Sequence, residues 1–155
     1  MNGYTINPST LAIIPISEHR TKVYVENNII IVPKSTQKLI EENCIHYGSS
    51  YAGRKKGTVD LIGVTHKSPI VIEDSKNIIF FPTCSPRLKN KCGWISLNNI
   101  ENYKAYENTS IIKFQNDLTL KIPISNKSLD NQILRATRLE SVFNKRKSEL
   151  LEKKI

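Results

Sequence analysis

Apolar and polar residues alternate over many short stretches between Thr10 and Pro123. A period of two residues is typical of β-strands, and the β-branched residues in these stretches favour the same structure. Asn27-Asn28 and Asn116-Asp117 stand between neighbouring stretches as the turns of two hairpins. The segment NIIFFPT is almost continuously apolar, which predicts a central strand. The predicted strands span residues 10–16, 22–26, 29–32, 58–64, 68–73, 77–83, 92–97, 110–115 and 118–123.

Two stretches have a helical period instead. Ser35 is a candidate N-cap for a short helix from Thr36 to Asn43. Near the C-terminus, apolar residues at three- and four-residue spacing predict a long amphipathic helix over about 126–152, with Ser125 or Ser128 as its N-cap. The inward-facing residues would be Leu39 and Ile40 in the first helix, and Leu129, Ile133, Ala136, Leu139 or Glu140, and Phe143 in the second.

These elements predict the fold class. The chain has no internal repeat, low-complexity tract or Gly/Ser linker, and 155 residues fit one domain. We therefore expect a single domain over residues 1–155, mainly β (α+β), built as an antiparallel sheet or a barrel-like β domain. A short internal helix and a long C-terminal amphipathic helix would complete it.

The segment GSSYAGRKKGT, residues 48–58, is rich in glycine and cations. Gly48 and Gly53 have the spacing of a nucleotide-binding P-loop, but Arg54 and Lys55 stand where that motif requires a lysine and a hydroxyl. Two interpretations remain open for this predicted loop. It meets an anion other than a nucleoside triphosphate, or its glycines only turn the chain.

The charge of the chain favours an anionic partner. Lys and Arg number 23 against 14 acidic residues, a formal net charge of +9. Such an excess indicates nucleic acid first and an anionic membrane surface second. Eight cations but only three acids lie between Asn43 and Ile100. A second basic cluster comprises Arg135, Arg138, Lys145, Arg146 and Lys147.

Three predicted strand-connecting loops, at residues 53–57, 66–67 and 86–91, carry seven of these eight cations. Lysine and arginine would neutralise phosphates there, while serine hydroxyls and loop N–H groups would donate to phosphate oxygens. Arg54, between two glycines, would also fit a narrow A-tract minor groove. The alternative is that these loops are solvated turns. The predicted DNA-binding residues are Ser49, Ser50, Tyr51, Arg54, Lys55, Lys56, Lys67, Arg87, Lys89 and Lys91.

The sequence contains no clear motif for a metal-binding or catalytic site. No pair among the cysteines and histidines has the C-x-x-C or H-x-x-x-H spacing of a zinc site, so we expect packed thiols, surface imidazoles and no metal. Cys44 and His46 are two residues apart, but no carboxylate is placed to orient them. We expect no catalytic residue, no cofactor and no enzyme activity. Trp94 is expected in the core, and Tyr51 is the aromatic expected to contact a ligand.

Targeting signals are also missing from the sequence. The N-terminal residues lack a basic region followed by an apolar run, and no apolar segment approaches the ~20 residues that span a bilayer. The odd number of cysteines, 3, fits a reducing compartment. We expect a cytoplasmic protein, associated with the nucleoid when it is bound to DNA, and no membrane partner.

Five motifs in this order resemble one known family. They are GSSYAGRKKGT (48–58), THKSPI (65–70), FFPTCSPR (80–87), CGWIS (92–96) and the run from PIS to NQILRAT (123–137). The chain from about Tyr4 to Lys147 resembles the ComK-type competence transcription factors of Gram-positive bacteria. The resemblance implies an activator of DNA-uptake and recombination genes that binds paired AT-rich promoter boxes, largely through the minor groove. It also implies a homodimer or tetramer, and as further partners RNA polymerase and a Clp protease adaptor.

Longer members of this family continue beyond the amphipathic helix with a tail associated with proteolytic control, whereas this sequence stops at LLEKKI. The resemblance is therefore to a short form. Two alternatives to a full activator stay open: a shortened paralogue that modulates a longer member through mixed oligomers or shared DNA sites, and a general nucleic-acid-binding module.

Overall fold

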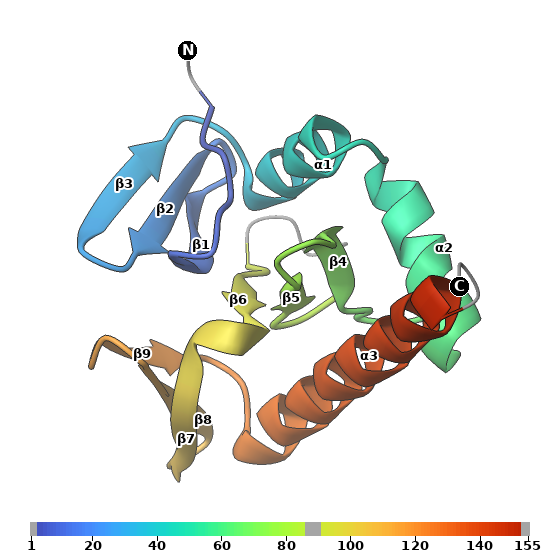
Figure 1. The fold of residues 1–155 in the computed structure, drawn as a ribbon. Coiled ribbons are helices and arrows are strands. Elements are labelled where there is room, and N and C mark those ends of the chain that lie inside the picture. Colours follow the sequence, from blue (N-terminus) through green and yellow to red (C-terminus); the bar gives the residue numbers. More distant parts are fainter. Residues whose placement is uncertain (1–2, 86–90, 153–155) are drawn as a thin grey trace.

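The computed structural model describes residues 3–85 and 91–152 of the chain. Two antiparallel sheets form its centre, and three α-helices pack around them (Figure 1). The elements are β1 (Thr10–Ser17), β2 (Arg20–Val25), β3 (Asn28–Val32), α1 (Thr36–His46), α2 (Tyr51–Ile62), β4 (Ile70–Glu73), β5 (Ile78–Pro82), β6 (Trp94–Ser96), a 3-10 turn (Leu97–Asn99), β7 (Ile100–Tyr106), β8 (Thr109–Phe114), β9 (Thr119–Ile122) and α3 (Asn126–Glu152).

The larger sheet has six strands in the order β3-β2-β1-β6-β5-β4, and the smaller has three in the order β7-β8-β9. All neighbouring strands pair antiparallel. The mainly β class with a long C-terminal helix is therefore confirmed. Of the two architectures expected, the structure has open sheets, because β3 and β4 are the edges of the larger one.

The larger sheet is buried on both faces at β4, β5 and β6, whereas β3 at its other edge carries exposed side chains. Along β5, Phe80 points into one hydrophobic cluster with Ile13, Trp94 and the inward side of α1, while Phe81 points into a second cluster with the smaller sheet and α3. Alternation along a strand sends successive side chains to opposite faces, so a strand covered on both sides reads as a continuous apolar run. The prediction that residues 77–83 form a central, buried strand is confirmed.

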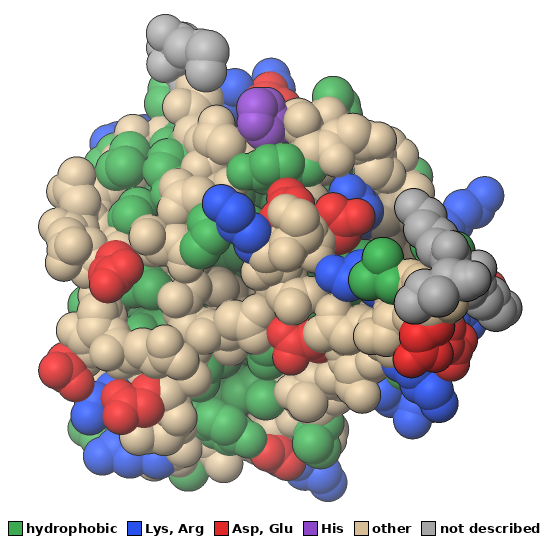
Figure 2. Space-filling model, in the orientation of Figure 1, with side chains coloured by type: hydrophobic (Ala, Val, Ile, Leu, Met, Phe, Trp, Pro, Cys, Tyr) green, Lys and Arg blue, Asp and Glu red, His purple; other side chains and the backbone are tan. Residues whose placement is uncertain are grey.

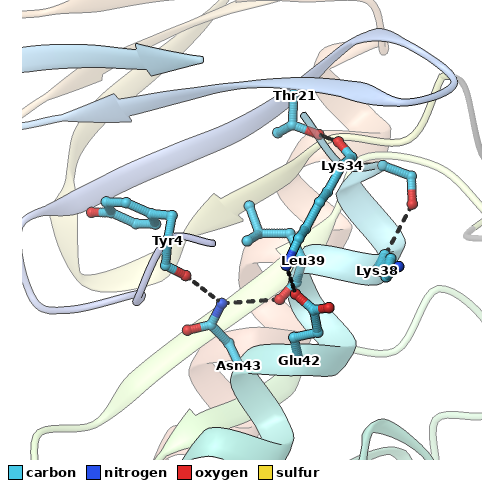
Figure 3. A network of polar contacts seen from close by, with 8 residues as sticks. Tyr4, Thr21, Lys34, Lys38, Leu39, Glu42 and Asn43 are labelled. Atoms are coloured by element: carbon cyan, nitrogen blue, oxygen red, sulfur yellow. Dashed lines mark hydrogen bonds and ion pairs between the residues drawn. The ribbon is translucent and has the colours of Figure 1, made fainter. Parts of the chain in front are cut away.

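A polar network joins α1 to the N-terminal segment (Figure 3). The buried amide of Asn43 donates to the carbonyls of Tyr4 and Leu39 at 2.9 Å each and accepts from the N–H of Ile6 at 2.8 Å. Lys34, after β3, pairs with Glu42 of α1. Ser35 is the N-cap, since its hydroxyl accepts from the N–H of Lys38 at 3.1 Å. The predicted cap is confirmed, and the helix runs beyond Asn43 to His46.

The C-terminal helix is also confirmed. The Ser125 hydroxyl, just ahead of the first turn, accepts from the N–H of Ser128 at 3.2 Å. Leu129, Ala136 and Leu139 are buried, and Ile133 and Phe143 pack against the same cluster. A buried glutamine, Gln132, donates to the carbonyl of Pro82 at 2.7 Å, which ties α3 to the end of β5.

The predicted basic loop at 48–58 and the predicted strand at 58–64 are wrong, because helix α2 occupies Tyr51–Ile62. Ser50 caps the helix by accepting from the N–H of Gly53 at 2.9 Å. Gly63 ends it in the left-handed conformation, with φ of 72°. Inside the helix Thr58 is buried and donates to the carbonyl of Pro69 at 2.6 Å. Capping and tertiary contacts thus override the low helix propensity of glycine and β-branched residues.

Two smaller predictions also differ from the structure. Strand β7 was not predicted, because all 7 of its residues are exposed or half-buried and its sequence does not alternate; pairing with β8 holds it in place. In the first hairpin Val25 pairs with Asn28, so the turn residues are Glu26-Asn27 rather than Asn27-Asn28. The turn between β8 and β9 does contain Asn116-Asp117, with Asp117 at φ of 71°.

Candidate nucleic-acid interface

The turn between α1 and α2 places the first group of predicted DNA-binding residues. Gly48 adopts φ of 93°, a conformation that a side chain disfavours, and lets the chain leave α1. The N–H groups of Gly48 and Ser49 donate back to the carbonyls of Ile45 and Cys44 at 3.0 Å each. Four residues, 47–50, therefore connect the two helices, and the serines lie at the N-terminal end of α2.

Three of the predicted residues have structural contacts at this turn. The Ser50 hydroxyl is engaged as the N-cap. Ser49 is half-buried, with its hydroxyl 3.5 Å from the Ser50 carbonyl. The ring of Tyr51 lies edge-on to buried Trp94, with 6.1 Å between centroids, and burial raises the pKa of Tyr51. Trp94 is fully buried, so its predicted place in the core is confirmed.

Arg54 turns back toward α1. Its Nη2 donates to the carbonyl of Tyr47 at 3.4 Å, at the C-terminal end of α1, where the helix dipole favours a cation. Its Nε is buried without a hydrogen-bond partner among the described residues. Its charge also acts on Cys44. Burial raises the pKa of the Cys44 thiol to about 11, although the positive charge of Arg54 lowers it. Arg54 therefore has a structural contact that the sequence pattern did not indicate.

Lys55 and Lys56 follow Arg54 in α2, turned by about 100° and about 200° from it around the helix axis. Lys56 is exposed and Lys55 half-buried, and within residues 3–85 and 91–152 neither makes an ion pair. The exposed surface beside Lys56 is formed by small residues, Ala52 and Gly53. A Cβ at Gly57 would meet no atom within 4 Å, so packing does not require glycine there. Since glycine inside a helix costs about 1 kcal/mol relative to alanine, close approach by an external partner is a reason for its presence.

The other predicted residues lie elsewhere. Lys67 follows α2 at φ of 49°, and its carbonyl accepts from Gln132 of α3 at 3.0 Å. Lys91 is exposed and lines a cavity of about 450 Å³ between the two sheets, which none of residues 49–56 lines. Arg87 and Lys89 lie outside the described residues. The structure thus brings together residues 49–56 but not the whole predicted set.

Helix α3 adds cations that were noted as a cluster but not assigned to the site. Arg146 pairs with Asp60 of α2 through Nη1 and Oδ2 at 3.0 Å, and Lys147 donates to the carbonyl of Asp74 at 2.9 Å. Arg138 and Lys145 are exposed and seven residues apart, so they lie on the same side of the helix. Figure 2 shows cations, mixed with acidic side chains, around the C-terminal part of α3 and the adjoining α2. Only the packing of α3 on α2 could reveal this proximity.

The remaining candidate residues have ordinary environments. Cys44 and Cys92 are buried and Cys84 is half-buried, while His46 and His66 are exposed. Among the described residues no group of three or more His, Cys, Asp and Glu side chains is arranged to hold a metal ion. Over the same residues, no helix combines the length and the apolar character needed to cross a membrane.

The fold and its surface define a basic α+β protein whose cations gather on two adjoining helices. Comparison with known proteins then identifies its family. A family model described as ComK protein matches residues 1–148, and the chain belongs to that family. It is 33% identical over 150 residues to the competence transcription factor of Bacillus subtilis (strain 168), an alignment that covers 94% of this chain and 78% of that protein. No solved structure matches the chain.

Proposed function

We propose that this protein is a competence-type transcription factor that acts by binding double-stranded DNA. Membership of the ComK family and the similarity to a competence transcription factor support this function. The family is one of transcription factors, which fits the expectation that the chain is not an enzyme. Because its partner would be DNA, we expect the protein to act in the cytoplasm, at the nucleoid.

The proposed interface is the exposed side of α2 together with the neighbouring cations of α3. The observation that carries it is the combination of two lysines outside the described ion pairs, Lys55 and Lys56, with a helix surface of glycine and alanine that a DNA backbone can approach closely. Arg138 and Lys145 add further exposed positive charge on α3. Arg54 supports the interface by holding the α1–α2 turn through its contact with the Tyr47 carbonyl.

The finer features follow from the family resemblance. Paired AT-rich boxes would be bound mainly through the minor groove, whose negative potential is enhanced in A-tracts and attracts cations. Two boxes call for a homodimer or tetramer. Activation would bring in RNA polymerase, and a Clp protease adaptor would limit the amount of protein.

The test is a gel-shift titration of the purified chain on a duplex with two A-tract/T-tract boxes and on a length-matched GC-rich duplex. The titration is made at two salt concentrations, with and without a minor-groove-binding competitor. Selective, salt-sensitive binding that the competitor abolishes is expected. Equal affinity for the two duplexes would contradict the sequence-specific role and favour a general nucleic-acid-binding module. No binding to either duplex would remove DNA as the partner.

A further inference from the structure

Two cysteines face each other where the pairing of β5 and β6 ends. The register of this antiparallel pair joins Phe80 to Ser96, Phe81 to Ile95 and Pro82 to Trp94. One backbone hydrogen bond continues past this pair, because the N–H of Thr83 donates to the carbonyl of Gly93 at 2.8 Å, while the N–H of Gly93 donates to the Thr83 hydroxyl at 3.0 Å. Extended two positions beyond Pro82 and Trp94, the same register places Cys84 opposite Cys92.

This position suits a covalent bond between the two side chains. The hydrogen bond at Thr83 and Gly93 makes the next pair a non-hydrogen-bonded one, in which Cα atoms lie about 4.5 Å apart and side chains are closest. Disulfides span Cα separations of about 4.4–6.8 Å. The Sγ of Cys92 already lies 3.2 Å from the carbonyl oxygen of Cys84. The register and this contact bring the two thiols to neighbouring positions.

The two thiols differ in access. Cys84 is half-buried and lines the cavity of about 450 Å³ between the sheets, together with Lys91 and Tyr24. Cys92 is only 2% exposed. The pKa of Cys92 is raised to about 12, mainly by burial, which the hydrogen bond to the Cys84 carbonyl opposes and the neighbouring Cys84 thiol reinforces. A small reagent entering the cavity therefore meets Cys84 first, and Cys92 is positioned to react second.

We propose that Cys84 and Cys92 form an oxidisable dithiol site that reacts with low-molecular-weight disulfides to give a reversible cross-strand disulfide. The Cys84 thiolate attacks one sulfur of R–S–S–R, forms a mixed disulfide and expels RS⁻, which takes up the proton that Cys84 lost. The Cys92 thiolate then attacks the Cys84 sulfur and expels the second RS⁻, which takes up the proton from Cys92. One R–S–S–R is reduced to two RSH while the two protein thiols are oxidised.

The site is separate from the proposed interface on α2, and its chemistry does not depend on DNA binding. The disulfide would close a ring from residue 84 to residue 92, which contains three cations of the predicted DNA-binding set, Arg87, Lys89 and Lys91. The third cysteine, Cys44, lies on α1 with no exposed surface and serves as an internal control.

The experiment treats the folded chain with oxidised glutathione at mildly alkaline pH, alkylates the remaining thiols in denaturant, and digests without reductant. Trypsin cleaves after Arg87, Lys89 and Lys91, so the disulfide links the peptides Asn77–Arg87 and Cys92–Lys104. We expect this linked pair to form and to separate on reduction. Free thiols should fall from 3 per chain to the single thiol of Cys44.

Variants and an unfolded control separate the site from general thiol oxidation. Cys92→Ser should stop at one glutathione on the peptide containing Cys84, Cys84→Ser should leave Cys92 unmodified, and Cys44→Ala should still form the link. Circular dichroism verifies that each variant is folded. The same chain oxidised in denaturant should give links that include Cys44. A folded chain that keeps glutathione on Cys84 without the linked pair, or that links Cys44 as often as the unfolded chain does, would overturn the proposal.

Discussion

At the scale of single residues, a buried amide shows how one side chain joins distant segments. Asn43 satisfies polar groups of Tyr4, Ile6 and Leu39 at once, and Ile6 lies far from α1 in the sequence. A buried polar group without a partner costs about 1–3 kcal/mol. The side chain therefore contributes to folding beyond the propensity of α1 itself.

Asn43→Ala should lower the free energy of unfolding by about 2–3 kcal/mol, because it leaves the N–H of Ile6 buried without an acceptor. Urea unfolding measures the change. Asn131→Ala is the control, since Asn131 is exposed on α3, and it should shift stability by less than about 0.5 kcal/mol. An equal, small effect of both substitutions would show that water takes over the hydrogen bonds of the amide.

A substitution at Gly57 should affect stability and DNA binding in opposite directions. Gly57→Ala should raise the free energy of unfolding by up to about 1 kcal/mol, because the added Cβ improves helix propensity and meets no atom within 4 Å. The same methyl should lower DNA affinity if the backbone of the DNA approaches here. Thermal unfolding and gel shift are measured together.

Gly53→Ala is the comparison for that variant. Its Cβ would lie 3.1 Å from the hydroxyl oxygens of Ser49 and Ser50, so it should gain less stability than Gly57→Ala. A Gly57→Ala protein that is more stable and binds DNA as tightly as the parent would place the DNA away from this turn of α2.

At the scale of elements, one hydrogen bond fastens β7 to α3. The hydroxyl of Tyr103 donates to the carboxylate of Asp130, and this hydrogen bond raises the pKa of Tyr103 from 10.0 to about 12. A pKa that is higher in the folded state means that the hydrogen bond stabilises fully below pH ~10, the unfolded value, and that its contribution disappears as pH rises toward 12.

Tyr103→Phe should accordingly cost about 0.5–1 kcal/mol at neutral pH, a modest value because the hydrogen bond is only partly buried and its net contribution is small. The stability difference between the parent and the variant should shrink between pH 10 and 12, where Tyr103 ionises first in the unfolded chain. Urea unfolding across this range measures the difference. If the stability difference between parent and variant stays constant with pH, the loss of stability comes from the ring and not from the hydroxyl.

The packing of α3 on α2 gives an element-scale prediction with opposite effects on stability and binding. Asp60→Ala removes the partner of Arg146 and should cost less than about 1 kcal/mol, as exposed ion pairs do. It should tighten DNA binding, because it removes a negative charge from the proposed interface and frees a cation. Glu107→Ala, the same charge change on the exposed turn after β7, is the control and should leave affinity nearly unchanged. Weaker binding by Asp60→Ala would argue against this surface.

At the scale of the whole molecule, the net charge of +9 predicts binding that weakens with salt. Replacing both Lys55 and Lys56 by alanine should lower DNA affinity and flatten the dependence of log K on log salt by about 0.9 for each phosphate that is no longer neutralised. Gel shifts at several salt concentrations measure the slope. The control removes the same charge at Lys104 and Lys127, which are exposed on β7 and α3. An identical slope in both double variants would mean that the interaction follows total charge and not the surface of α2.

How far the sequence predicts this molecule depends on how local each signal is. The central strand around Phe80 and the C-terminal helix were predicted correctly because each carries a complete period in its own residues. Helix α2 was not predicted, because its glycine and β-branched residues have low helix propensity. The helix is stabilised by the N-cap of Ser50 and by the hydrogen bond from Thr58 to the carbonyl of Pro69. Strand β7 has no alternating apolar pattern, and it forms because it pairs with β8.

The candidate site divides in the same way. The abundance of cations, and Lys55 and Lys56 among them, could be found from the sequence. The contact of Arg54 with the end of α1 could not, because it depends on how the chain turns at Gly48.

The sequence by itself determined the mainly β class, the long amphipathic helix, the basic charge and the family, since all four depend on residue types and their order. Only the tertiary structure decided that α2 is a helix, that Arg146 of α3 reaches α2, and that Cys84 faces Cys92. These features join residues far apart in the chain or depend on register. They arise because the burial of two apolar clusters fixes the positions of all elements together. A local sequence pattern does not contain this information.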